Sequence, residues 1–130
     1  MMNRRQSLLL TLSALAFSSH AHQAHSTDDA QAITHVMKRQ FDRPDAPLIV
    51  QPVTILGDAA VAGWTQGGKG GRALLRKEKS GWAIYVCAGK GLTQSDVLAM
   101  TGLSKNVATE LAQRVVKAEA NLTAQQRALF

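Results

Sequence analysis

Two groups of side chains in this sequence could bind a transition metal. The first consists of three sulfur-bearing residues, Met37, Cys87 and Met100. Thioether and thiolate ligands are soft, and soft ligands select Cu(I). Each residue also fits an ordinary core position, because Met37 follows Val36 on an apolar helix face and Met100 lies near Val97. The sequence leaves open whether these sulfurs pack in the core or bind a metal.

The second group is a cluster of histidines near the N-terminus, formed by His20, His22 and His25. If the exported chain begins at His22, that residue offers a free amine and an imidazole together. Such a chelate suits Cu(II), and His25 can add a second imidazole. The alternative is a short histidine-containing tail that binds nothing.

This chemistry depends on export, and residues 1–21 are predicted to be a secretory signal peptide. Two arginines precede an apolar segment over residues 8–17, which is shorter than the roughly 20 residues that span a bilayer. Small residues follow and predict cleavage after Ala21, with cleavage after Ala16 as the rival. We expect a periplasmic protein that has no stable membrane span once the signal is removed.

Charge and cysteine content narrow the function further. The chain has 15 Lys and Arg against 9 Asp and Glu, and removal of Arg4 and Arg5 with the signal leaves 13 against 9. The remaining basic residues are scattered and lack interleaved aromatic residues, so we expect no nucleic-acid partner. Cys87 is the single cysteine. It cannot form an internal disulfide, and it is therefore a buried thiol, an intermolecular bridge or a soft metal ligand.

The order of the predicted elements indicates an α+β fold. After a flexible tail over residues 22–28, the elements are a helix over 29–41, strands over 48–56, 59–66, 72–77 and 82–87, and three C-terminal helices that open near Thr93, Ser104 and Thr123. We predict a single domain over 29–130, with an N-terminal helix, a four-stranded antiparallel meander and C-terminal helices packed on one face.

Local sequence signals predict how these elements begin and turn. Asp28 and Asp29 are expected to supply the negative first turn of the first helix. Thr93 has the spacing of a capping box, and Ser104 is expected to cap the longer C-terminal helix. The glycine-rich residues 67–71 predict the loop of a β-hairpin.

Two further motifs resemble known binding elements but depart from their patterns. Residues 63–69 nearly match a phosphate-binding loop, yet Gly70 stands where a Ser or Thr would bind magnesium. Residues 97–107 resemble a helix-turn-helix, yet Leu98 occupies a position that is usually small, and Val107 falls one residue before the expected buried aliphatic position. We interpret them as a hairpin loop and an ordinary helix pair.

Catalysis is not indicated by any group of residues. Cys87 and His35 could be paired as nucleophile and base, but the sequence points to no third group that would orient the base. The acidic residues are mostly in predicted caps and turns, so they offer no pair for acid–base chemistry. We therefore expect a protein that is not an enzyme.

Residues 61–75, followed by Trp82, Cys87-Ala88-Gly89 and Leu92, resemble the copper-uptake-system-associated proteins, a family of small exported bacterial proteins. The resemblance runs from about residue 30 to residue 125. It implies a periplasmic copper chaperone or buffer that works beside an outer-membrane copper importer or other periplasmic copper carriers. The resemblance assigns no catalytic activity and supplies no ligand set.

The leading hypothesis is therefore a periplasmic copper-binding protein. Its candidate copper ligands are His22, His25, Met37, Cys87 and Met100. The alternative is a metal-free interaction module that docks on an importer or receptor component through its sheet or its glycine loop. In that case Trp64, if it is exposed beside the loop, is the candidate contact.

Overall fold

The computed structural model describes the backbone of residues 21–130 and the side chains from residue 27 onward. Along the chain, the elements are α1 (Ala21–Phe41), β1 (Ile49–Leu56), β2 (Ala59–Gln66), β3 (Lys69–Glu78), β4 (Gly81–Ala88), the 3-10 helix η1 (Lys90–Thr93), α2 (Ser95–Met100), α3 (Lys105–Glu119) and α4 (Ala124–Arg127). All four predicted strands are present. The predicted signal peptide lies outside the described residues, except for Ala21.

The four strands form one antiparallel sheet in the order β1-β2-β3-β4, so each strand pairs with its neighbour in sequence. The turn between β2 and β3 consists of Gly67 and Gly68, with φ values of 56° and 78°. Two successive positive φ values are typical of a type I′ hairpin turn. The loop predicted over 67–71 is thus too wide, because Gly70 already belongs to β3 and pairs with Thr65.

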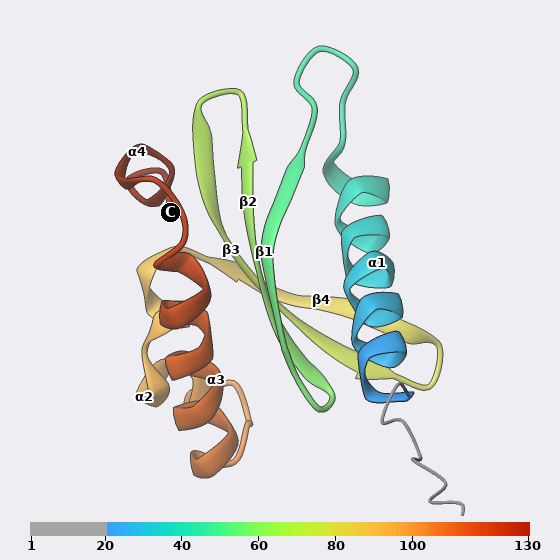
Figure 1. Ribbon diagram of the computed structural model, residues 1–130, viewed down its shortest axis with the longest axis vertical. Helices are drawn as coiled ribbons and strands as arrows, with labels where there is room; N and C mark the ends of the chain where they lie inside the picture. Colours follow the sequence, from blue (N-terminus) through green and yellow to red (C-terminus); the bar gives the residue numbers. More distant parts are fainter. Residues whose placement is uncertain (1–20) are drawn as a thin grey trace, which may run out of the picture.

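Helices cover both faces of the sheet, with α1 on one face and α2 and α3 on the other (Figure 1). Side chains alternate along a strand, so β2 and β3 supply apolar residues to both layers. The layer under α2 and α3 includes Ala59, Val61, Leu74, Leu98, Ala108, Leu111 and Val115. The layer under α1 includes Ile33, Met37, Leu48, Ala60, Ala62, Ala73, Leu75 and Trp82. The α+β prediction is confirmed, and α1 covers the face that the sequence pattern did not assign to a helix.

The helix ends agree with the sequence only in part. Ser104 Oγ accepts a hydrogen bond from Val107 N at 3.3 Å, which confirms the predicted cap of α3. The capping box predicted at Thr93 is wrong, because this residue lies in η1 and its hydroxyl donates to Lys90 O at 2.8 Å. The preceding 3-10 turn uses that hydroxyl, and α2 begins without a side-chain cap.

Within the described residues, helix α1 runs from Ala21, whereas the sequence predicted a flexible tail over 22–28. No Gly or Pro interrupts the segment, and Ala and Gln favour a helix. Asp29 therefore lies inside the helix and not in its first turn. Its Oδ1 accepts hydrogen bonds from Trp82 Nε1 and Lys77 Nζ, both at 3.0 Å, and these bonds attach α1 to the sheet.

A buried ion pair joins β3 to the end of α3. Arg72 and Glu119 are 7% and 5% exposed. Arg72 Nε donates to the two Glu119 carboxylate oxygens at 2.8 and 3.1 Å, and Nη2 donates to the same carboxylate. The Phe130 ring covers the guanidinium, with its centroid 5.2 Å from Cζ. This pair fixes where α3 ends on the sheet.

Removal of the Glu119 carboxylate is expected to destabilise the protein strongly. Glu119→Ala leaves the Arg72 charge buried and unpaired, which costs about 3–5 kcal/mol in the free energy of unfolding. Urea denaturation checks this value. Glu110→Ala is the matched control, because it breaks the exposed pair with Arg114, and its cost is about 0.5 kcal/mol or less. If both variants lost the same free energy of unfolding, the Arg72–Glu119 pair would not be buried as described.

The C-terminal residues pack against a strand at a glycine. A Cβ placed on Gly63 would lie 2.7 Å from Gln51 O and 2.9 Å from two carbons of the Phe130 ring. A methyl group at this position therefore forces the ring or the neighbouring strand to move. The glycine allows the C-terminal segment to lie directly on β2.

Gly63→Ala is accordingly expected to lower the free energy of unfolding by about 1–3 kcal/mol, the usual cost of overpacking. The unaltered protein serves as the comparison. Thermal denaturation of the two proteins measures the difference. A Gly63→Ala protein as stable as the unaltered protein would show that the C-terminal segment does not pack as described.

Candidate functional site

Cys87 lies on the edge strand β4, at the border of a small apolar cavity. The residue is exposed. The cavity has a volume of about 180 Å³ and is lined by Phe41, Leu48, Trp64, Gln66 and Cys87. Phe41 ends α1, and Leu48 directly precedes β1, so the cavity lies between the C-terminal end of α1 and the sheet. We call it the Cys87 cavity.

The glycines of β3 make room for one wall of this cavity. A Cβ on Gly71 would lie 3.0 and 3.2 Å from two carbons of the Trp64 indole. Any larger residue would displace the ring, so Gly71 allows the indole to lie against β3. The glycine-rich string that the sequence suggested as a loop thus helps to position Trp64.

The cavity also changes the chemistry of the thiol. Partial burial raises the pKa of Cys87 above the ordinary value for cysteine. The residue as a whole is exposed, but it lines an apolar cavity, where the charged thiolate is poorly solvated. At neutral pH the protonated thiol is therefore favoured more strongly than in a free cysteine.

The structure does not bring the three predicted sulfur ligands together. Met37 is 1% exposed and lies in the core under α1, on the same side of the sheet as the Cys87 cavity. Met100 is 86% exposed at the end of α2, which packs on the opposite face. With copper–sulfur bonds close to the ~2.3 Å of zinc–thiolate, one ion cannot reach both layers. A single site with all three sulfurs requires a rearrangement.

The predicted histidine ligands fall at the start of α1. His22 and His25 lie outside the residues whose side chains are described, so the chelate at the new N-terminus stays a prediction. His35 is exposed on α1. Among the residues with described side chains, no group of three or more His, Cys, Asp or Glu is placed to hold a metal ion.

Trp64, the predicted interaction residue, is half-buried and packs against the core under α1. The sequence suggested an exposed side chain beside a flexible glycine loop. The indole is covered because Gly71 continues β3 and leaves room for the ring to lie against the strand. Its remaining accessible surface borders the Cys87 cavity.

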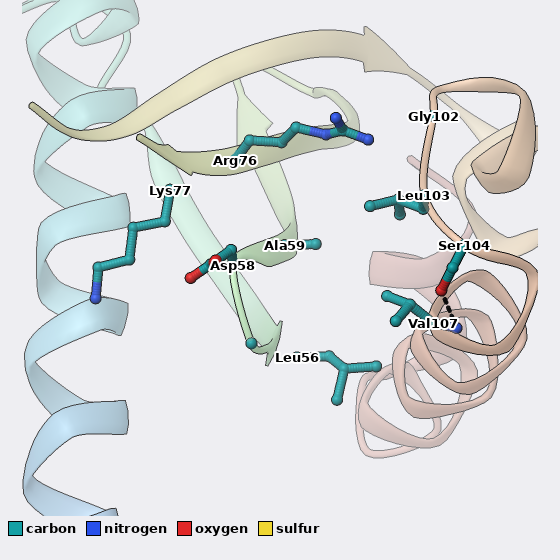
Figure 2. A pocket seen from close by; sticks show the side chains of 10 residues that line it. Leu56, Asp58, Ala59, Arg76, Lys77, Gly102, Leu103, Ser104 and Val107 are labelled. Atoms are coloured by element: carbon teal, nitrogen blue, oxygen red, sulfur yellow. Dashed lines mark hydrogen bonds between the residues drawn. The ribbon is translucent and has the colours of Figure 1, made fainter. Parts of the chain in front are cut away.

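A second hollow, of about 440 Å³, lies between the β1–β2 turn and the α2–α3 turn (Figure 2). Three of its polar side chains, Ser104, Arg76 and Lys77, already hold the fold together. Ser104 caps α3, and Arg76 Nη2 donates to Thr101 O at 2.9 Å. Lys77 points toward α1, where it binds Asp29 (Figure 2). The Cys87 cavity is therefore the stronger candidate for a functional site.

Comparison with known proteins adds no relative. No family model, no curated protein and no solved structure matches this chain. The resemblance to the copper-uptake-system-associated proteins therefore stays a prediction. Within the part of the chain that is described, no helix combines the length and apolar character needed to cross a membrane.

The raised pKa of Cys87 predicts slow alkylation at neutral pH. Thiolate is the reactive form, so the rate of reaction with iodoacetamide is expected to rise with pH and to reach half its maximum above the ordinary cysteine pKa. The same protein in concentrated urea is the control. Unfolding removes the cavity, so the pH at which the alkylation rate is half-maximal is expected to fall. Identical midpoints with and without urea would contradict the proposed effect of burial.

Proposed function

We propose that this protein is an exported, non-catalytic copper-binding protein that accepts copper beside an outer-membrane importer and passes it to periplasmic carriers. The supporting observation is the position of Cys87, a soft ligand that is exposed at the edge of the sheet beside an apolar cavity. The resemblance to the copper-uptake-system-associated proteins supports copper as the cargo. Cys87 is the residue that we expect to bind Cu(I).

An exposed site suits a protein that must release its metal. Transfer requires an incoming ligand from the next carrier to reach the bound ion, and a thiol on an edge strand is open to such a ligand. Trp64 lines the same cavity, and an indole face attracts cations. The site therefore combines one strong ligand with a weaker contact that does not prevent exchange.

The raised pKa of the thiol also fits this role in an oxidising compartment. Oxidants attack the thiolate, so a thiol that stays protonated survives longer without metal. Binding of Cu(I) then displaces the proton. Below the thiol pKa, the apparent affinity is expected to rise about tenfold per pH unit, because one proton is released for each ion bound.

The N-terminal histidines offer a second copper site within the same function. If cleavage leaves His22 at the N-terminus, the amine and imidazole nitrogens suit Cu(II), whereas Cys87 suits Cu(I). The two sites differ in the oxidation state that they prefer, so titrations with each ion separate them.

Cu(I) titration of residues 22–130 against a competing chelator, without oxygen, tests the Cys87 site. Cys87→Ser is expected to lower the Cu(I) affinity by at least about tenfold, since the one thiolate ligand is lost. Met100→Leu and Met37→Leu are matched controls that remove a sulfur elsewhere, and both are expected to keep the affinity. The affinity of the unaltered protein should also rise with pH as described.

Removal of residues 22–25 tests the histidine site by the same approach with Cu(II). A loss of Cu(II) binding with Cu(I) binding retained would place the two ions at separate sites. If neither ion binds the full mature chain more tightly than micromolar, the proposed copper function is wrong.

A further inference from the structure

The Cys87 cavity is large for a space between packed layers of a small domain. Protein interiors contain few voids larger than a water molecule, whereas this one has a volume of about 180 Å³. Its lining residue Leu48 is 2% exposed, while Phe41 is 36% exposed and Cys87 is exposed as well. A small molecule can therefore reach the cavity beside Phe41 and Cys87, with Leu48 as its inner wall.

The residues that line the cavity fit an uncharged guest. Phe41, Leu48 and Trp64 are apolar, and burial raises the pKa of Cys87, so its thiol is neutral at pH 7. The amide of Gln66 uses both of its N–H groups, which donate to Phe41 O at 2.7 Å and to Ala46 O at 2.8 Å. A charged guest would lose its hydration here and meet no opposite charge among these residues. An apolar guest gains contacts without that cost.

Two of the cavity walls favour an aromatic guest. Phe41 lines the cavity from the end of α1, and Trp64 lines it from β2. Aromatic rings attract one another in stacked or edge-to-face arrangements, beyond what the burial of their surface provides. An apolar cavity of ~150 Å³ holds benzene, so the volume of the Cys87 cavity suits one ring.

Hydrogen bonds fix the connection between α1 and β1, which is flanked by two walls of the cavity, Phe41 and Leu48. The two bonds from Gln66 hold the start and the middle of this connection. Near its end, Leu48 N donates to Asp42 Oδ1 at 2.8 Å. The protein itself therefore sets the shape of the cavity, and a preformed site loses little conformational freedom when a ligand binds.

We propose that the Cys87 cavity binds a small, uncharged molecule with a single aromatic ring, which contacts Phe41, Leu48 and Trp64. This site does not require copper, so it goes beyond the proposed metal function. Because Cys87 borders the cavity, a bound ring lies beside the thiol and limits the access of other reagents to it.

Titration of the metal-free mature protein with toluene, in the presence of a chelator, tests this site. Saturable shifts are expected for the Trp64 indole N–H and for the Leu48 methyl resonances, with a Kd of about a millimolar or tighter. Benzoate is the matched control ligand, since it has the same ring with a carboxylate. It is expected to cause no saturable shift, because its charge would lose hydration in the cavity.

Variants that fill the cavity show where toluene binds. Leu48→Phe enlarges the inner wall and should abolish the shifts, whereas Met100→Phe adds a ring at the exposed end of α2 and should keep them. If Leu48→Phe does not fold, Cys87→Leu adds volume at the border of the cavity and should weaken binding by at least about tenfold.

The thiol reports occupancy of the cavity independently. Toluene at saturation should slow the alkylation of Cys87 by iodoacetamide by about twofold or more, whereas benzoate should not. Cys87→Ser keeps the side-chain volume nearly unchanged, so toluene affinity should stay within about threefold while Cu(I) affinity falls. The aromatic site and the copper site can therefore fail separately.

Three results would overturn the proposal. The first is the lack of saturable toluene binding up to the solubility of toluene in water. The second is binding of benzoate as tight as that of toluene. The third is unchanged toluene binding in folded Leu48→Phe or Cys87→Leu, because the ring would then lie outside the Cys87 cavity.

Discussion

The central strands of this protein carry apolar side chains on both faces, and both faces must be removed from water. In β2 and β3, Ala60, Ala62 and Leu75 face α1, while Val61 and Leu74 face α3. A helix on one face alone would leave half of this apolar surface exposed, at a cost of ~25 cal/mol for each Å². The chain therefore folds into three layers, with α1 on one face of the sheet and α2 and α3 on the other. Helix α1 is as necessary to the core as α3.

The same constraint explains why two charged side chains that reach these layers, Arg72 and Asp29, have partners of opposite charge. Arg72 lies on a strand that is covered on both sides, and a buried guanidinium is tolerated only with a partner. Glu119, at the end of α3, supplies that partner. Asp29 has the corresponding role for α1, where it accepts bonds from Trp82 and Lys77. Helices α1 and α3 are thus each tied to the sheet by one acidic side chain.

Local patterns predicted most of the fold and little of the site. The strands follow from apolar runs bounded by turn residues, and the cap at Ser104 follows from a hydrogen bond between near neighbours, so both were visible in the sequence. The role of Asp29 was not, because Trp82 lies 53 residues away and nothing local distinguishes a tethering carboxylate from a helix-capping one. The Cys87 cavity was hidden for the same reason, since its walls come from α1, β2 and β4 and meet only after folding.

The outer strand β4 is where this architecture leaves a reactive side chain accessible. Most apolar residues of β2 and β3 are buried in the two cores, so a residue that must meet another molecule is best placed on an outer strand. Cys87 lies on such a strand, and it borders a cavity that partly shields its thiol.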